Sequence, residues 1–180
     1  MGRPFDDVFG AEFEPLHGYI ARRLGVSAAD DLTAETFAIA YRRWSTLDPS
    51  LPVRPWLYGI ASNLLRHHWR KERRMLRAYA RTGVDPVVAH EGAASLDRID
   101  AQAERHALAA ALAGLRHEER EVLLLHAWAG LADNEIAESL SVPVGTVKSR
   151  LSRGREHMRN RLGPSGQVEV QTPKTVHQRS

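Results

Sequence analysis

The sequence predicts an all-α protein made of two small helical domains joined by a flexible linker. Apolar residues recur at helical spacing through most of the 180 residues, and no segment alternates with the period of two that is typical of β-strands. The helical pattern fades from about Tyr79 to Asp100, where glycine, proline and scattered acids occur, and then resumes. Each half should therefore build its own core, which predicts two lobes rather than one globule.

Three helices are expected in the N-terminal half, each with an apolar face. The first should end at Gly25 and the second should begin between Ser27 and Asp31. Two proline-containing pairs, Asp48-Pro49 and Leu51-Pro52, mark a loop, and Pro55 suits the first turn of the third helix. The apolar face of the first helix consists of Phe13, Leu16, Ile20 and Leu24. That of the second consists of Phe37, Ala40, Tyr41 and Trp44, and that of the third of Leu57, Ile60, Ala61, Leu64 and Leu65.

A second helical array should begin near Ala101 and end before Gly163-Pro164, after which the polar tail should be mobile. Its first two helices carry apolar residues at Leu108, Leu112 and Leu115 and at Val122, Leu123, Leu125 and Trp128. These limits divide the chain into a first domain at 1–78, a linker at 79–104, a second domain at 105–162 and a flexible tail at 163–180.

Composition indicates a folded protein without disulfides or a membrane anchor. The chain is 43% hydrophobic and 26% charged, and it has no cysteine, which fits a reducing compartment. Residues 1–7 lack the basic start and apolar run of a signal peptide, and no stretch of about 18 apolar residues is present. We therefore expect a cytoplasmic protein.

Charge is unevenly distributed, although the net charge is only +3. Residues 66–81 contain seven Arg or Lys and one acid, residues 144–162 contain six and one, and residues 82–104 contain five acids and one Arg. Two basic blocks around an acidic segment predict two nucleic-acid contacts joined by a segment that avoids DNA. Two solvated helix faces and a soluble linker explain the charges equally well, so the charges alone do not distinguish DNA binding from an ordinary solvated surface.

Residues 133–151 have the pattern of a helix-turn-helix. Ile136 and Leu140 bury one helix face, residues 141–145 form a tight turn with a proline, and Val147 and Leu151 anchor a second helix to the first. The second helix then exposes side chains that can donate hydrogen bonds to guanine edges or phosphates, namely Lys148, Ser149, Ser152 and Arg153.

Three further positions bear on this motif. Thr146 is a candidate cap for the second helix, and Arg155 extends its basic surface toward Arg159 and Arg161. Ser141 stands in the turn where glycine is common, and serine adopts a positive φ less readily than glycine.

Four segments have an order and spacing that point to one family. In the N-terminal half they are DDLTAETF at 30–37, followed by AYRRW at 40–44, and PWLYGIASNL at 55–64. In the C-terminal half they are EREVLLL at 119–125 and PVGTVKSRL at 143–151. Together they resemble the extracytoplasmic-function (ECF) sigma factors of bacterial RNA polymerase, over residues 5–162 apart from the linker. Two departures, Arg116-His117 for a common Leu-Pro and Ala132-Asp133 for Ser-Tyr, concern local helix caps.

The resemblance implies one polymerase contact and two DNA contacts. The helix at 30–44 would hold the polymerase clamp helices through Asp31, Glu35, Thr36, Arg42 and Arg43. The helix at 56–70 would meet the −10 element through Trp56, Asn63, Arg66, His67, Arg70 and Lys71, with Asn63 in a pocket for a flipped-out base. The recognition helix would read the −35 element through Thr146, Lys148, Ser149, Ser152, Arg153 and Arg155.

The function that the resemblance implies is transcription initiation without catalysis by the chain itself. Its partners would be core RNA polymerase, promoter DNA and, as in many members, an anti-sigma factor, with no membrane insertion. The alternatives are a polymerase-independent helix-turn-helix regulator, usually a dimer, and an adaptor that binds only proteins. No cofactor or metal is expected, because His117-Glu118 begins a zinc-protease motif in which Glu121 replaces the second histidine.

Overall fold

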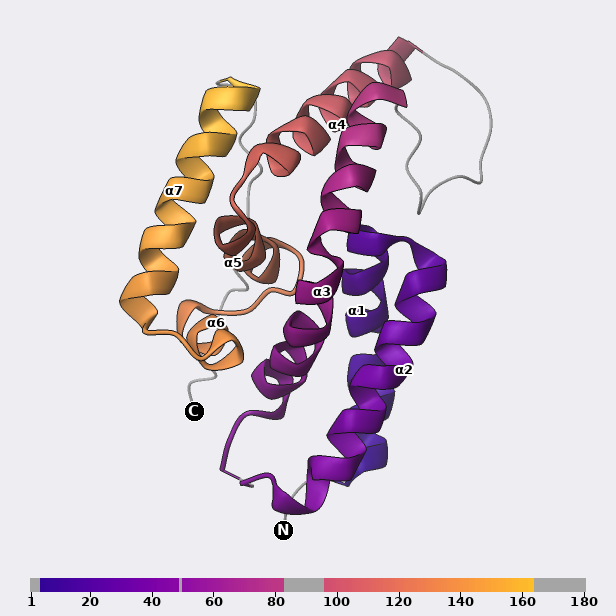
Figure 1. Ribbon diagram of the computed structural model, residues 1–180, viewed down its shortest axis with the longest axis vertical. Helices are drawn as coiled ribbons and strands as arrows, with labels where there is room; N and C mark the ends of the chain where they lie inside the picture. The colour runs from indigo at the N-terminus through magenta and orange to yellow at the C-terminus, as the bar shows by residue number, and fades with distance from the viewer. Residues whose placement is uncertain (1–3, 49, 83–95, 164–180) are drawn as a thin grey trace, which may run out of the picture.

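The computed structural model describes residues 4–48, 50–82 and 96–163, which form helices joined by short connections (Figure 1). Within these ranges there is no strand, which confirms the all-α prediction. The elements in chain order are α1 (Phe5–Leu24), α2 (Val26–Arg43), the 3-10 helix η1 (Trp44–Thr46), α3 (Val53–Thr82), α4 (Leu96–Gly114), α5 (His117–Ala127), α6 (Asp133–Leu140) and α7 (Val144–Leu162).

The N-terminal half is a unit of three helices in which α1 and α2 pack against each other and against α3. The turn between α1 and α2 requires Gly25, because its φ of +88° lies in the region that favours glycine. Leu16, Ile20 and Phe37, spaced at helical intervals along α1 and α2, are buried in the core of this unit.

The long helix α3 is the central element of the molecule. Its 30 residues span about 45 Å, and Figure 1 shows it between α1 and α2 on one side and α4 to α6 on the other. Its first half buries Leu57, Tyr58 and Ala61, and its second half is rich in exposed basic residues. In the described part of the chain, neither α3 nor any other helix is both long and apolar enough to cross a membrane.

The C-terminal half is a unit of four helices. The last of them, α7, packs against α4, α5 and α6, and the pair α6 and α7 forms the predicted helix-turn-helix. Ile136 and Val147 are fully buried, Leu151 is nearly so, and Leu140 is half-buried. The residues predicted to hold the two helices together therefore do so.

Two of the long helices extend into the predicted linker. Helix α3 continues to Thr82 and α4 already begins at Leu96, so both helices extend into the segment 79–104. The apolar pattern fades there because side chains such as Arg81 and Glu104 face solvent, while the backbone stays helical. The rest of the predicted linker, residues 83–95, and the predicted tail from 164 lie outside the described residues.

The two halves are not separate lobes, and the prediction of two lobes was wrong in this respect. Helix α3 packs along α4 and α6, and buried apolar residues from both halves belong to one continuous cluster. The sequence pattern assigned the apolar face of α3 to the N-terminal core alone. The second face of α3 carries Gly59, Ser62 and Glu72, which are small or polar and nevertheless buried against the C-terminal half.

Candidate nucleic-acid interface

The turn of the helix-turn-helix depends on an unusual conformation of Ser141. Its φ of 53° and ψ of 47° are left-handed, and it is the one non-glycine residue with positive φ in the described ranges. Its backbone N–H donates to the carbonyl of Glu138 at 3.2 Å, and that of Val142 donates to Ala137 at 3.0 Å. These bonds satisfy carbonyls at the end of α6, while the conformation costs a serine about 1 kcal/mol.

Ser141→Gly should therefore raise the free energy of unfolding by about 0.5–1 kcal/mol, because glycine adopts the left-handed region without steric cost. Urea unfolding followed by circular dichroism measures this difference. The matched control is Ser152→Gly on α7, where the backbone is helical and glycine should lower the stability by about 0.5–1 kcal/mol. A decrease for Ser141→Gly would show that the turn is not strained.

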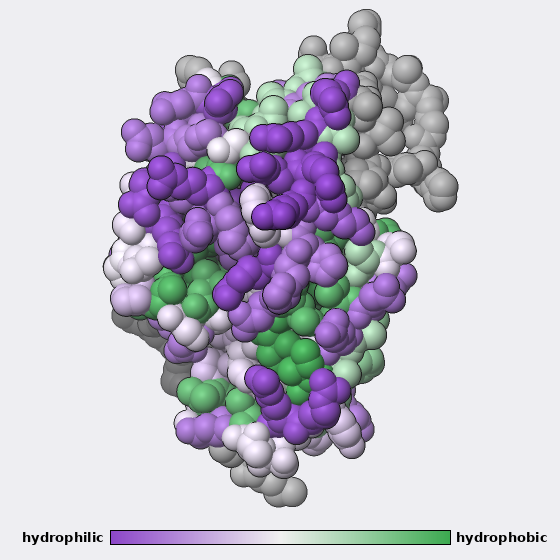
Figure 2. Space-filling view, in the orientation of Figure 1, coloured by the Kyte–Doolittle hydropathy of each residue, from purple (hydrophilic) through white to green (hydrophobic). Residues whose placement is uncertain are grey.

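The outer face of α7 presents most of the predicted recognition residues. Lys148, Ser149, Ser152, Arg153 and Arg155 are exposed. The position of Thr146 corrects the expectation of a cap: α7 begins at Val144 with Pro143 as its N-cap, and the half-buried Thr146 lies within the first turn. Figure 2 shows hydrophilic side chains gathered on the face that α7, α4 and α3 share.

Two arginines on α7 already have partners on α5. The Nε of Arg153 donates to Glu119 at 3.1 Å, and the guanidinium of Arg155 lies 2.9 Å from Nε2 of His126. The Arg153 side chain is 58% exposed, so this ion pair contributes little to stability and can be exchanged for a DNA contact.

The predicted −10 residues on α3 are mostly exposed as well. Asn63, Arg66, His67, Arg70 and Lys71 face solvent. The remaining predicted residue, Trp56, differs from these five. It was expected to share a side with Asn63 and Arg70, but it is half-buried, and its ring lies 6.2 Å from the ring of Trp44. Trp69 is also half-buried, with the guanidinium groups of Arg70 and Arg73 at 5.6 and 5.1 Å from its ring.

The predicted polymerase-binding residues on α2 form an exposed surface with one exception. Asp31, Glu35, Arg42 and Arg43 are exposed. Thr36 is buried, and its hydroxyl donates to the carbonyl of Leu32 at 2.7 Å. Its side chain therefore belongs to the interior of the N-terminal half and does not reach the surface that the other four share.

A buried charge cluster lies between the two halves, and the sequence pattern did not predict it. It consists of Arg23 on α1, Glu72 on α3, and Arg120 and Glu121 on α5, and we call these four residues the charge cluster. Arg23 donates to Glu72 at 2.8 Å and to Glu121 at 2.7 Å, and Arg120 donates to Glu72 at 3.2 Å. One sign was available in the sequence, because Arg23 follows Leu16 by seven residues and so lies on the apolar face of α1.

Hydrogen bonds complete this cluster and fix its protonation. Ser62 donates to Glu121 at 2.8 Å, and the Tyr19 hydroxyl accepts from Arg23 at 2.6 Å. Burial alone would raise the pKa of Glu121, but the charge and hydrogen bonds of Arg23 and the hydrogen bond of Ser62 hold it below its usual value. Burial is also the main reason that the pKa of Tyr19 is raised, so this phenol stays neutral.

The lowered pKa of Glu121 predicts an acid-sensitive contribution to stability. A carboxyl whose pKa is lower in the folded state stabilises the fold above its unfolded pKa, near 4.5, and this contribution is lost as the pH falls toward the folded pKa. Urea unfolding from neutral pH down through this range should therefore show a steeper loss for the wild type than for Glu121→Gln. If the stabilities of the wild type and Glu121→Gln fall equally with pH, the lowered pKa of Glu121 in the folded protein is contradicted.

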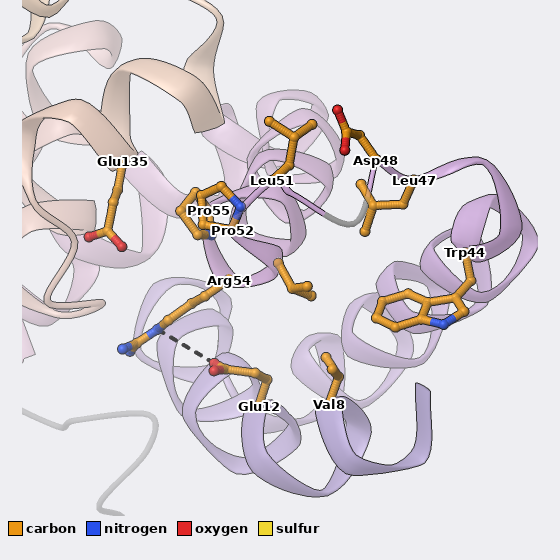
Figure 3. Close-up of a pocket in the computed structure, with 11 residues that line it drawn as sticks. Val8, Glu12, Trp44, Leu47, Asp48, Leu51, Pro52, Arg54, Pro55 and Glu135 are labelled. Atoms are coloured by element: carbon orange, nitrogen blue, oxygen red, sulfur yellow. Dashed lines mark ion pairs between the residues drawn. The ribbon is translucent and has the colours of Figure 1, made fainter. Parts of the chain in front are cut away.

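A second contact between the halves involves Arg54 at the start of α3. Its guanidinium donates to the carbonyl of Ala129 at 2.8 Å, and Figure 3 shows it directed at Glu12 of α1, 3.5 Å away. The surrounding cavity, about 580 Å³, is lined by α1, by the connection before α3 and by Glu135 of α6. Arg54 thus links α1 and α3 to the C-terminal half.

The fold and these surfaces define a helix-turn-helix DNA-binding protein with a second basic helical domain. Residues 11–75 match the family model described as Sigma-70 region 2, and residues 105–158 match Sigma-70, region 4. The chain belongs to the ECF sigma factors of RNA polymerase.

Several curated relatives are similar over most of their length. The chain is 31% identical over 160 residues to the RNA polymerase sigma factor CarQ of Myxococcus xanthus, covering 88% of this chain and 89% of CarQ. It is 29% identical over 171 residues to the ECF RNA polymerase sigma factor SigW of Bacillus subtilis, covering 88% of each. It is 30% identical over 163 residues to the ECF sigma factor SigC of Mycobacterium tuberculosis, covering 86% of this chain and 81% of SigC.

Solved structures share the fold. CnrH in complex with the cytosolic domain of CnrY matches with a TM-score of 0.61 at 23% identity, covering 87% of this chain and 85% of CnrH. The sigma factor RpoE of Bartonella quintana, in complex with the anti-sigma factor NepR, matches with a TM-score of 0.62 at 22% identity, covering 88% of this chain and 96% of RpoE.

Proposed function

We propose that this chain binds core RNA polymerase and directs it to promoters, where it recognises two DNA elements and starts transcription. The observation that carries this proposal is the pairing, in one chain and in order, of a region 2 domain and a region 4 domain, each with an exposed basic helix. Promoter recognition is the function of this family, and the two basic helices supply the two DNA contacts that it needs.

Each surface has a distinct role in this proposal. The exposed face of α2, with Asp31, Glu35, Arg42 and Arg43, binds the polymerase. The exposed face of α3 around Asn63 holds the single strand of the −10 element, where arginines contact phosphates and the asparagine amide hydrogen-bonds an unstacked base. The outer face of α7 reads duplex DNA at the −35 element. Opening of the duplex is then driven by binding energy, and the chain itself catalyses no reaction.

A regulator that works without polymerase is the less favoured alternative. The helix-turn-helix alone would serve such a regulator, but the region 2 match at residues 11–75 covers the whole of α2 and most of α3. An anti-sigma factor is a further proposed partner, because the related structures CnrH and RpoE each hold a bound partner, which for RpoE is named as an anti-sigma factor.

The deciding experiment combines binding and synthesis. Purified chain should be retained by tagged core polymerase and should support run-off transcription from a library of double-stranded promoters. A matched variant, Glu35→Arg with Asp31→Arg, reverses charge on the α2 face and should lose polymerase binding while remaining folded, since both side chains are exposed. Failure of the wild-type chain to associate with core polymerase would refute the proposed function.

A further inference from the structure

A cavity between α3 and the start of α5 is lined mainly by arginines. Its volume is about 450 Å³, which lies within the range of roughly 300–1,000 Å³ that is typical of small-molecule sites. Arg66 and Arg73 of α3 line it from one side, and Arg116 and Arg120 line it from the other. Among the described residues of its lining, Glu118 is the one carboxylate. The cavity therefore favours an anion.

Two buried nitrogen atoms at this cavity have no hydrogen-bond partner. Arg120 is 1% exposed, and its Nη2 donates to Glu72 at 3.2 Å. Its Nε is buried as well and has no partner among the described residues, and the same holds for Nδ1 of His117, which also lines the cavity. Buried polar atoms are nearly always hydrogen-bonded, so a ligand that accepts hydrogen bonds here would complete the site.

The charge of the arginines identifies the kind of ligand. In the described ranges Arg66, Arg73 and Arg116 take part in no ion pair, whereas the charge of Arg120 is balanced within the charge cluster. Set against Glu118, the first three leave an excess of two positive charges. Guanidinium groups bind phosphate oxygens through paired hydrogen bonds, which favours phosphate groups over a compact anion such as chloride.

The cavity also has an apolar wall and more room than one phosphate group needs. The wall consists of Leu115, which is buried, and Trp69, which is half-buried. The guanidinium of Arg73 lies 5.1 Å from the centre of the Trp69 ring, and this contact holds it at the wall. A duplex cannot bring its phosphates to Arg120, because that side chain is buried at the cavity and the DNA backbone continues on both sides of each phosphate.

We propose that this cavity binds a small molecule with two or more linked phosphate groups, either a nucleoside diphosphate or inorganic pyrophosphate. Arg66, Arg73 and Arg116 contact the phosphate oxygens, with Arg120 beneath them. In a nucleotide, the base packs against Trp69 and Leu115. The site belongs to the free chain and does not depend on polymerase or promoter DNA.

Isothermal titration calorimetry of the full-length chain at constant ionic strength tests this proposal. Pyrophosphate and ADP should each bind at one site with a Kd of about 10–500 μM. Inorganic orthophosphate should bind at least about tenfold more weakly, because it contacts fewer of the arginines. Tighter binding of ADP than of pyrophosphate would identify the ligand as a nucleotide, and equal binding would identify it as an inorganic polyphosphate. Both of these results support the site.

Two variants with matched controls locate the ligand. Arg73→Gln and Arg116→Gln should each weaken binding of pyrophosphate at least about tenfold. Arg74 of α3 and Arg105 of α4 are exposed and lie outside the lining of the cavity, so Arg74→Gln and Arg105→Gln should change the Kd by less than about twofold. Arg116 is exposed, so its variant remains folded even if Arg73→Gln is destabilised. Circular dichroism checks the fold of all four.

Tryptophan fluorescence supplies an independent readout. The chain has four tryptophans, of which Trp69 lines the cavity. Binding of ADP should change the emission of the wild type, and Trp69→Phe should lose most of this change while it still binds pyrophosphate.

Three results would overturn the proposal. The first is no saturable binding of pyrophosphate or ADP below about 10 mM. The second is an equal loss of affinity in the cavity variants and their controls, which would mean that only the overall charge of the chain attracts the anion. The third is that Arg73→Gln and Arg116→Gln weaken the binding of a short single-stranded oligonucleotide and not that of pyrophosphate, which would assign these arginines to DNA.

Discussion

Arg23→Ala should lower the free energy of unfolding by about 3–5 kcal/mol, because it removes the centre of the charge cluster. Arg23 is 2% exposed and donates to Glu72 at 2.8 Å and to Glu121 at 2.7 Å. Without it, two buried carboxylates remain and only Glu72 keeps an ion pair, with Arg120 at 3.2 Å. One carboxyl must then take up a proton or draw water into the site. Urea unfolding near neutral pH measures the loss.

The neighbouring residue provides the control for this change. Arg22 is exposed on the same helix, so Arg22→Ala removes the same charge and side chain and should change the stability by less than about 0.5 kcal/mol. The difference between the two variants should shrink as the pH falls below the usual pKa of glutamate, since protonated carboxyls no longer need Arg23. Equal losses for Arg22→Ala and Arg23→Ala would mean that the charge cluster does not stabilise the fold.

The helices themselves could be predicted because their signals are local. The periodic apolar residues of α1, α2 and α7 and the stop at Gly25 are found within a few turns of the chain. The ends of α3 and α4 could not be placed, because there the helices continue with polar side chains and the apolar pattern that marks a helix is lost.

Contacts between distant residues are harder to foresee. Arg23 is separated from Glu72 by 49 residues and from Glu121 by 98, and nothing in the local sequence pairs them. The packing of the two halves, in which the backbone of Ser139 lies against Gly59, could not be predicted for the same reason, because neither residue has a special local signature. A positive φ is unfavourable for serine, yet the adjacent hydrogen bonds and the burial of Val147 hold Ser141 in that conformation.

The exposed residues of the candidate site could be predicted wherever the spacing of the apolar residues along a helix shows which side chains face outward. On α7 the inward positions Val147 and Leu151 determine which side chains face out, and the structure places Lys148, Ser152 and Arg153 there. Thr36 could not be placed in this way. A threonine suits both an exposed helix position and a buried one where its hydroxyl bonds to the preceding turn, and here the hydroxyl bonds to Leu32.

Asn63→Ala should reduce the formation of the open promoter complex by about tenfold to a hundredfold, because it removes the amide proposed to hydrogen-bond the unstacked −10 base. The exposed position of Asn63 on α3 allows this contact. Binding of the holoenzyme to a duplex fragment with only the upstream element should change by less than about twofold. Permanganate footprinting reports strand opening, and fluorescence anisotropy reports duplex binding.

Arg153→Ala is the matched comparison, and it should show the opposite pattern. Arg153 on α7 is expected to contact the upstream duplex, so its loss should weaken duplex binding about fivefold to a hundredfold and affect opening only through that binding. A folding defect cannot explain the Asn63→Ala result, because alanine is the better helix former at an exposed helical position and should slightly raise the stability. Equal losses of duplex binding and opening in Asn63→Ala would therefore exclude base capture by Asn63.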